Sequence, residues 1–552
     1  MARKQRTSKK TKELFRDPSG QPDLFEKSYQ EELEARAKNQ VECLGMTFEN
    51  DEARRAYFLE KLKEKLKDPG FRKIEGFPIG SDEDILALSD PPYYTACPNP
   101  FIEDFIRCYG KPYDSKTDKY RQEPFAADTS AGKFDPIYRA HSYHTKVPYL
   151  AIQEYLFHYT EPGDCILDLF CGTGMTGAAA RLMDDGSRHS ILVDLSPEAS
   201  FIAGAMINVH NYQKVKSEHQ KIGKELYSST KQIYSGLIDP PSGDVNYTVW
   251  SDVFICPECT SEIVYWNAAV DIQTGDIKST ILCSKCNSEL CKDDLIRCME
   301  SFTDVATGIQ IRQTKTVPVL LDLTIDGRRI QRRPLDRESK RIREINPMEF
   351  SSVFPTNEMM FVGEKWGDSW RAGYHKGFSR VHHFYERRSI AALGKLYSLI
   401  LESNERNSLL FMLSGMLPRA SRLHKWKKGQ TTGITTGTLY VPSLRYEYNI
   451  NKMWKERIAY AFPVISCKKD RNHIVSTQSS TQLKNIPNES ADYIFVDPPF
   501  GDNLMYSELN FIWESWLHVF TNRLPEAIIS ASQNKGLNEY LDLMSGVLTT
   551  RS

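Results

Sequence analysis

The stretch LDLFCGTGMTGAAA (residues 167–180) constrains the fold of this chain more than any other. Apolar residues up to Phe170 predict a strand, and Gly172 and Gly174 predict a tight turn whose backbone can approach a ligand closely. A helix follows at once, and its small residues 177–180 fit against a sheet. HSILVDLS then predicts a second strand that ends at Asp194, about 20 residues later. This order of elements indicates an α/β fold with a parallel sheet.

The glycine turn predicts a site for a nucleotide-like ligand. Gly172, Gly174 and Gly177 complete the pattern GxGxxG, and a carboxylate at Asp194 can hold ribose hydroxyls. The loop alone is compatible with a dinucleotide, with another nucleoside-containing cofactor, or with a turn that needs glycine only for its geometry.

A second informative feature is a pair of Asp-Pro-Pro tetrads. The C-terminal tetrad (residues 497–500) follows the strand pattern ADYIFV, whereas the N-terminal tetrad (residues 90–93) follows DEDILALS, which is more helix-like. We therefore expect chemistry at residues 497–500 and a rigid turn at residues 90–93. A wall of the binding pocket, or a catalytic tetrad that precedes the glycine loop, are the alternatives for the N-terminal copy.

The segment before the glycine loop carries a family resemblance. HTKVP, a helix, EPGD and CILDLFCGTGMT follow one another. This succession resembles the amino-directed DNA methyltransferases of the N6-adenine and N4-cytosine type, which also carry a D/N/S-P-P-Y/F/W tetrad at the tip of the fourth strand. The resemblance implies a Rossmann-like class I methyltransferase sheet with S-adenosylmethionine as cofactor. The cofactor-binding residues that it implies are Thr145, Lys146, Asp168, Phe170, Gly172, Gly174 and Asp194.

The chemistry of amino methylation accounts for the C-terminal tetrad. The lone pair of an exocyclic amine is delocalised into the base, and two acceptors for its hydrogens favour a pyramidal nitrogen with a free lone pair. Asp497 offers a carboxylate and Pro498 a carbonyl, while Pro498 and Pro499 stiffen the turn. Phe500 offers a ring face to a base that has swung out of the double helix. We expect this step to need positioning and no metal, with adenine N6 favoured over cytosine N4.

Two Cys-x-x-Cys motifs predict a metal site. CPEC supplies Cys256 and Cys259, CSKC supplies Cys283 and Cys286, and 23 residues lie between the motifs. This spacing is typical of a structural zinc ribbon with four thiolate ligands, and reduced core thiols are the alternative. Twelve cysteines without a secretory signal indicate a reducing compartment, so we expect a cytoplasmic protein.

The chain divides into five predicted regions. We expect a basic mobile tail at 1–50, a helical and loop region at 51–140, the cofactor-binding half of the methyltransferase domain at 141–210, an insertion at 211–470 with the zinc ribbon near 250–295, and the catalytic half at 471–552. The net charge of −1 means that DNA contacts must come from local patches. Three basic stretches of the insertion fit such contacts: GRRIQRRPLDRESKRIR, SRVHHFYERR and RASRLHKWKK.

Other features leave alternatives open. We expect no membrane span, because no apolar run approaches the required length. Only 52 residues follow Phe500, whereas three further strands of a full methyltransferase sheet need roughly 100. We therefore expect a shortened sheet, and the chain could be a fragment, a split enzyme that needs a second chain, or an inactive remnant. A restriction or phage-defence protein is the other partner that we consider. An RNA base methyltransferase and a truncated, non-catalytic, zinc-containing DNA-binding subunit are the other functions that fit the sequence.

Overall fold

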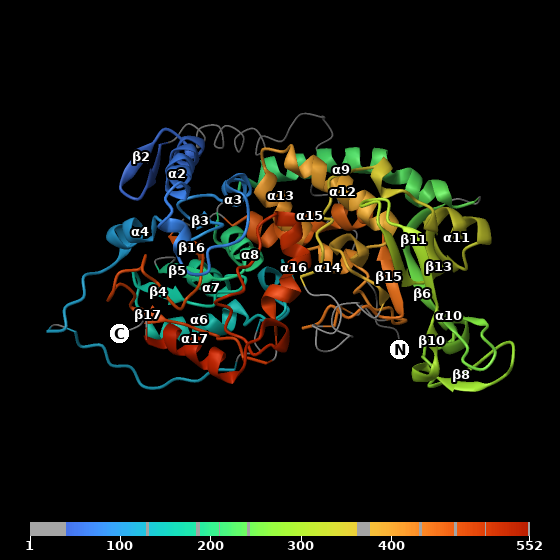
Figure 1. Ribbon diagram of the computed structural model, residues 1–552. Coiled ribbons are helices and arrows are strands. Elements are labelled where there is room, and N and C mark those ends of the chain that lie inside the picture. Colours follow the sequence, from blue (N-terminus) through green and yellow to red (C-terminus); the bar gives the residue numbers. More distant parts are fainter. Residues whose placement is uncertain are drawn as a thin grey trace, which may run out of the picture.

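The computed structural model describes residues 40–549 except 117, 129–131, 184–187, 209, 240–242, 361–375, 430–432, 436, 468–471 and 503. Figure 1 shows an elongated molecule with a parallel sheet at one end, an antiparallel sheet at the other and helices between them. In the described part of the chain, no helix is both long and apolar enough to span a bilayer.

The parallel sheet contains the glycine loop and the C-terminal tetrad. Its strand order is β17-β4-β5-β16-β3, and every neighbouring pair is parallel. The strands are β3 (Tyr94–Thr95), β4 (Cys165–Asp168), β5 (His189–Asp194), β16 (His473–Thr477) and β17 (Tyr493–Ile494). Because the carboxyl ends of parallel strands meet at one edge, the loops after β4, β5, β16 and β17 gather there. The α/β prediction with a parallel sheet is confirmed.

Helices cover this sheet. Small residues at the start of α7 allow it to approach closely, since a Cβ atom on Gly177 would lie 2.7 Å from the Leu192 side chain. The helices of this part are α5 (Pro136–Arg139), α6 (Tyr149–Tyr159), α7 (Met175–Leu182), α8 (Pro197–Ile207), α16 (Tyr506–Leu517) and α17 (Leu537–Thr549).

The region before β3 is structured earlier than we predicted. Residues 41–48 form a hairpin of β1 (Val41–Cys43) and β2 (Met46–Phe48), so the predicted mobile tail to residue 50 is wrong at its end. The hairpin is held by apolar packing: Cys43 is 2% exposed, and the Phe48 ring contacts Phe58. Residues 1–39 lie outside the described part. The hairpin is followed by α2 (Asp51–Leu66), α3 (Asp82–Leu88) and α4 (Ile102–Tyr109).

The insertion contains an antiparallel sheet that the sequence analysis did not predict. The twelve-residue strand β6 pairs with β7, β10, β13 and β15, and β14 extends the sheet beyond β13. Separate hairpins and a helix complete this end of the molecule. The elements are β6 (Asp244–Ile255), β7 (Glu262–Val264), α10 (Tyr265–Ala269), β8 (Thr280–Leu282), β9 (Glu289–Cys291), β10 (Ile296–Arg297), β11 (Met299–Thr303), β12 (Gln310–Thr314), β13 (Thr316–Ile325), β14 (Arg328–Arg332), α11 (Asp336–Arg343) and β15 (Leu444–Tyr448).

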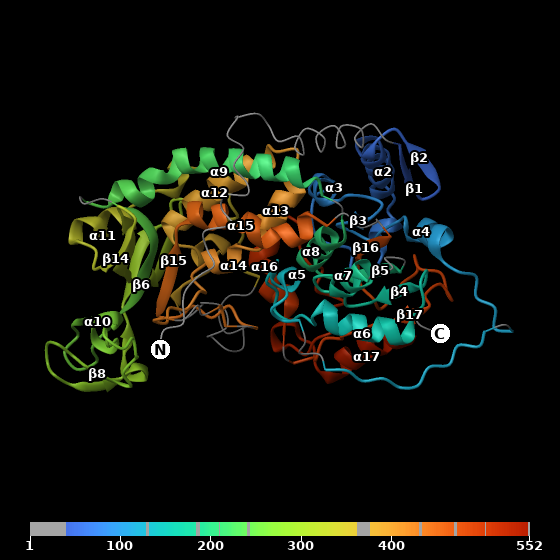
Figure 2. The ribbon, with the colours of Figure 1, turned by 180° about the vertical axis from the view of Figure 1, so that it is seen from behind.

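Helices of the insertion join the two sheets into one body. They are α9 (Tyr212–Tyr234), α12 (Arg387–Leu401), α13 (Arg406–Ser414), α14 (Leu417–Ala420) and α15 (Ile450–Ile465). Leu396 of α12 and Ile202 of α8 belong to the same continuous core, while the cysteine motifs pack in a separate, smaller cluster. Figures 1 and 2 show these helices between the sheets. The helices of the insertion therefore share one core with the parallel sheet.

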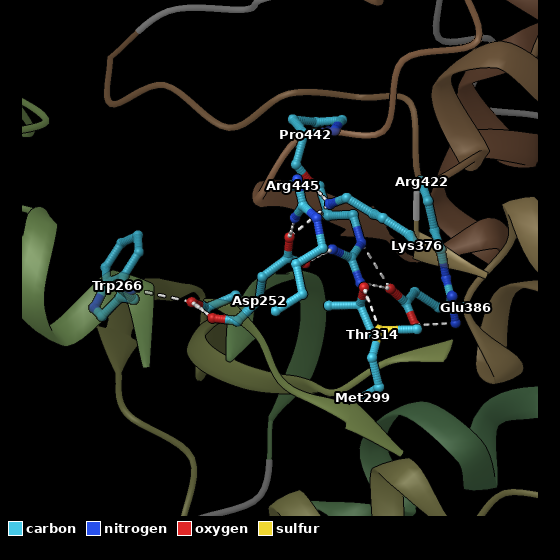
Figure 3. Close-up of polar contacts among 11 residues, drawn as sticks. Asp252, Trp266, Met299, Thr314, Lys376, Glu386, Arg422, Pro442 and Arg445 are labelled. Carbon is cyan, nitrogen blue, oxygen red and sulfur yellow. Dashed lines mark hydrogen bonds and ion pairs between the residues drawn. The ribbon is translucent and has the colours of Figure 1, made fainter. Parts of the chain in front are cut away.

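A buried ion network fixes the antiparallel sheet to the helices (Figure 3). Lys376 and Arg445 bind the two oxygens of Asp252 on β6 at 2.6 and 3.0 Å, and Arg445 and Arg422 bind Glu386 at 3.0 and 2.9 Å. Asp252 is fully buried. Buried charges are costly to desolvate, so each of these groups depends on its partners. The predicted DNA-contacting stretch SRVHHFYERR is mostly buried around this network, which makes that prediction wrong for it.

We expect Asp252→Ala to destabilise the protein by about 3–5 kcal/mol, because Lys376 and Arg445 would remain buried without this carboxylate. Urea unfolding followed by circular dichroism measures the difference. Glu103→Ala is the control: it removes an exposed ion pair with Arg107 and should leave the transition unchanged. Equal unfolding midpoints for Asp252→Ala and the wild type would refute the role of the network.

Candidate active site

The glycine loop turns sharply at the carboxyl end of β4. Gly172 and Gly174 have φ values of +50° and +75°, a region that glycine enters without steric cost. A Cβ atom on Gly174 would lie 2.8 Å from Ala203, so the helix α8 also requires glycine there. The Gly172 N–H donates to Asp194 Oδ2 at 2.8 Å, which ties the loop to the end of β5.

Two carboxylates, one buried at Asp168 and one half-buried at Asp194, shape the floor of the site. Asp168 accepts the Thr176 hydroxyl at 2.5 Å and the Phe170 N–H at 3.1 Å, and Asp194 also accepts the Ser196 N–H at 2.9 Å. Burial raises the pKa of Asp168 to about 7 and that of Asp194 to about 6. Their bonds to backbone and to the start of α7 hold this side of the site in one conformation.

The C-terminal tetrad follows β17 and presents open acceptors. Burial raises the pKa of Asp497, whose side chain is still partly exposed. Within the described residues, no hydrogen bond reaches the Asp497 carboxylate or the Pro498 carbonyl, whereas the Pro499 carbonyl accepts the Tyr540 hydroxyl at 2.9 Å. The Phe500 side chain is 75% exposed. The two acceptors and the ring that the sequence predicted therefore face accessible space.

One pocket brings these residues together. Its walls include the whole tetrad 497–500 and, among the predicted cofactor-binding residues, Thr145, Lys146, Asp168, Phe170, Gly172 and Asp194. Gly174 is not in the wall. It caps the start of α7 and packs against Ala203 of α8. Residues more than 300 positions apart in sequence thus share one cavity at the carboxyl edge of the sheet.

Several residues in the wall of this pocket or directly behind it were not predicted from the sequence. Asn510 on α16 donates to the Tyr143 hydroxyl and to Ser196 Oγ, both at 2.9 Å, and its Oδ1 lies 3.1 Å from His144 Nε2. Thr145 Oγ1 and the Tyr506 hydroxyl are 2.8 Å apart. These bonds join the loop before α6 to the helix after the tetrad. The sequence signal was the polar run YSELN close behind the tetrad.

The N-terminal tetrad lies at the opposite, amino edge of the sheet. It precedes β3, and Asp90 is held by Arg54 at 3.0 Å and by Asn208 at the end of α8 at 2.5 Å. The carbonyl of Pro91 accepts from Arg54, and that of Pro92 accepts from Asn99. All the acceptors that an amino substrate would need are engaged, and the tetrad does not line the pocket. This geometry favours the rigid-turn interpretation.

The four predicted zinc ligands converge in space. Cys256 Sγ lies 3.7 Å from Cys286 Sγ, and Cys259 Sγ lies 3.6 Å from Cys283 Sγ. A tetrahedral site with Zn–S bonds of about 2.3 Å places sulfur atoms about 3.8 Å apart. Both motifs form the same knuckle, in which the N–H groups of Thr260 and Asn287 donate to the carbonyls of the first cysteines. The residues therefore fit one zinc ion.

A second cluster, Asp304 with His382 and His383, has the residue types of a metal site. The ring nitrogen of His383 that faces the cluster carries a proton, however, and a protonated nitrogen does not bind a metal. The Ser379 N–H donates to His383 Nδ1, and burial lowers the pKa of His383 to about 4. A neutral ring that accepts at Nδ1 carries its proton on Nε2, which faces Asp304 at 3.5 Å. The cluster is therefore a hydrogen-bonded support for the hairpin of β11 and β12.

The arginine-rich stretch 327–343 is largely paired within the insertion. Arg329 binds Asp322, Arg332 binds Glu338, and Arg343 binds Glu300. Arg337 and Arg341 share Asp239. These ion pairs reduce the charge that the stretch offers to DNA. The stretch 419–428 differs, since Arg419, Lys425, Lys427 and Lys428 are exposed.

We expect purified protein to contain one equivalent of zinc, and Cys283→Ser to lose it, because three thiolates bind zinc less tightly than four. Plasma mass spectrometry measures the metal content. Cys291→Ser is the matched control: Cys291 is exposed, lies in the same region and is outside the cluster. Zinc retained in Cys283→Ser at the level of Cys291→Ser would contradict the assignment.

Comparison with known families gives one match. Residues 24–203, less than half of the chain, match the family model N6_N4_Mtase, described as DNA methylase. The matched segment contains the N-terminal tetrad and the glycine loop but ends before the C-terminal tetrad. No curated protein and no solved structure matches the chain. By sequence, this part of the chain is therefore similar to the DNA methylases that the family model describes.

Proposed function

We propose that the chain transfers a methyl group from S-adenosylmethionine to an exocyclic amino group of a base in DNA, with adenine N6 favoured over cytosine N4. The observation that carries this proposal is the shared pocket of the glycine loop and the C-terminal tetrad. The family match supports a DNA base methyltransferase. A restriction-modification or phage-defence setting is the biological context that we propose.

The residues of the pocket fit S-adenosylmethionine. Asp194 would hold the ribose, Gly172 leaves room for the ligand beside it, and Thr145 and Lys146 would lie at the methionine end. The bound cofactor supplies an electrophilic methyl group. The bonds from Asp168 and Asp194 to the loop backbone keep this side of the pocket preformed, which reduces the conformational entropy lost on binding.

The residues of the tetrad act on the amine. The Asp497 carboxylate and the Pro498 carbonyl accept its two hydrogens, which keeps the nitrogen lone pair out of conjugation with the ring. As the new N–C bond forms, the S–C bond between the methyl group and its donor breaks and a neutral thioether leaves. The nitrogen gains positive charge and releases one proton. The Asp497 carboxylate is placed to take this proton and, because it is partly exposed, to pass it to water. Phe500 stacks on the extruded base.

The choice between the tetrads rests on position. The family match covers the N-terminal copy, but Asp90 is bound to Arg54 at the amino edge of the sheet, away from the glycine loop. Methyl transfer requires the amine and the methyl donor to be in contact. We therefore assign the acceptor role to Asp497.

The direct test is transfer of labelled methyl groups from S-adenosylmethionine to unmethylated genomic DNA, followed by nucleoside analysis. N6-methyladenine is the expected product. N4-methylcytosine would show that the target base is cytosine and not adenine. Label in RNA alone would favour the RNA methyltransferase alternative. Zinc and DNA binding without cofactor binding or product would favour the DNA-binding subunit.

We expect Asp497→Ala to lower kcat at least about 100-fold while cofactor affinity is retained, because it removes a group that acts in the transition state. Asp90→Ala is its matched counterpart. It should lower the melting temperature, since buried Arg54 loses a partner, but leave turnover near that of the wild type. The reverse pattern of activities would assign the chemistry to the N-terminal tetrad.

We expect Asp194→Ala to weaken S-adenosylmethionine binding about 10- to 100-fold, since a hydrogen bond to a charged group contributes about 1.5–3 kcal/mol. Asp194 also anchors Gly172, so the loop itself loses support. Titration calorimetry gives the dissociation constants. Asp104→Ala, on the exposed face of α4, is the control. Unchanged affinity in Asp194→Ala would exclude a ribose contact.

A further inference from the structure

A second cavity adjoins the active-site pocket. The two cavities share Tyr143 and Lys146 in the loop before α6. From there the second cavity extends to α14 and α15 of the insertion and to α16, which follows the C-terminal tetrad. Figure 2 shows these helices meeting α5 between the two sheets. The cavity is therefore placed where a strand of nucleic acid entering the active site would pass.

The cavity wall contains a buried cation without a counterion. Arg457 on α15 is 7% exposed, and its Nε and Nη2 donate to the carbonyls of Met412 at 2.8 Å and Ala140 at 2.7 Å. Among the described residues, no carboxylate forms an ion pair with it. Burial lowers the pKa of Arg457 to about 10, so the guanidinium stays charged at neutral pH. A desolvated charge that lacks a partner is unfavourable until an anion arrives.

Further positive charge surrounds Arg457. Lys146 Nζ donates to the carbonyls of Tyr138 and His141 and forms no ion pair within the described residues. Burial together with the charge of Arg457 lowers the pKa of Lys146 to about 8. Arg139 and Arg419 are exposed in the cavity wall.

Acidic groups do not balance these cations. Glu198 is buried in the wall, and burial raises its pKa to about 8, so it is mostly uncharged at neutral pH. Glu456 is the remaining carboxylate among the described wall residues, and it is exposed. The cavity therefore carries net positive charge beside the site of methyl transfer.

We infer that this cavity binds a backbone phosphate of the DNA strand next to the extruded nucleotide, with Arg457 as its buried contact and Arg419 at its rim. The inference rests on the proposed function. A phosphate supplies the negative charge that the guanidinium lacks, together with further acceptor oxygens. Contacts of this kind position a strand without reading its sequence, which suits a cavity adjacent to a base-binding pocket.

The test measures DNA binding and turnover in variants of the full chain. We expect Arg457→Gln and Arg419→Gln each to reduce the slope of log affinity against log salt by about 1, to weaken DNA binding about 10-fold, and to raise KM for DNA with little change in kcat. Arg107→Gln removes one exposed cation from α4 and is the charge-matched control. Unmethylated genomic fragments of uniform length are the probe.

Two further variants guard against a loss of folding. Arg457→Lys keeps the charge and should restore part of the salt dependence. Gly415→Ala leaves the charge in place but should displace the guanidinium, because the new Cβ would lie 1.8 Å from Arg457 Nη2. If Arg457→Gln lowers the melting temperature, Gly415→Ala and Arg419→Gln decide the question.

Three results would overturn the inference. Salt slopes and KM values equal to those of Arg107→Gln would remove the phosphate contact. Weaker S-adenosylmethionine binding with normal DNA binding would show that the anion is the carboxylate of the cofactor, since Lys146 lines both cavities. If inorganic phosphate protects Arg457 from chemical modification but the Arg457 variants bind DNA like the wild type, the cavity is a site for free phosphate and not for DNA. Wild-type protein that neither binds nor methylates DNA would instead refute the proposed function itself.

Discussion

The parallel pairing of β17 with β4 is the interaction on which the candidate site depends. Only two residue pairs form it, Tyr493 with Ile166 and Ile494 with Leu167. Flanking bonds extend it, because Asp492 Oδ2 accepts the Cys165 N–H at 2.7 Å and the Phe495 N–H donates to Leu167 at 3.0 Å. Without this pairing, the tetrad 497–500 would lose its connection to the strand that leads into the glycine loop.

The two halves of the pocket differ in rigidity, and the difference follows from their bonding. On the cofactor side, the buried Asp168 and the half-buried Asp194 accept hydrogen bonds from the backbone around them. On the base side, the Asp497 carboxylate and the Pro498 carbonyl are open within the described structure, and Phe500 is exposed. A preformed cofactor half and an open base half agree with a substrate that must leave a base stack before it fits.

Local sequence signals predicted the parts of the site that local geometry determines. Gly172 and Gly174 have positive φ, and Asp194 ends the next strand. The two cysteine knuckles have the same backbone turn. The element before each tetrad was also predicted from local pattern, since the structure has a helix, α3, before Asp90 and a strand, β17, before Asp497.

Features that depend on distant partners could not be predicted in this way. The arginines of 327–343 resembled a phosphate-binding patch, but Asp322, Glu338, Asp239 and Glu300 pair with them in the folded chain. Likewise, β6 pairs with β15 almost 200 residues later, so its sheet has no signature in either segment alone. A run of arginines in a sequence shows only that phosphate contacts are possible. The fold determines which of these arginines are paired with carboxylates and which remain available to DNA.

The buried ion network connects these distant parts to the second cavity. Arg422 binds Glu386 of the network, and its N–H donates to the Phe384 carbonyl at 2.7 Å. Arg419 lies one turn earlier in the chain, at the end of α14, and its guanidinium packs over Tyr448 of β15 at 4.4 Å. The segment that carries Arg419 is thus fixed from both sides to the antiparallel sheet. The insertion therefore does more than extend the molecule, because its sheet holds the exposed Arg419 in the wall of a cavity that adjoins the active-site pocket.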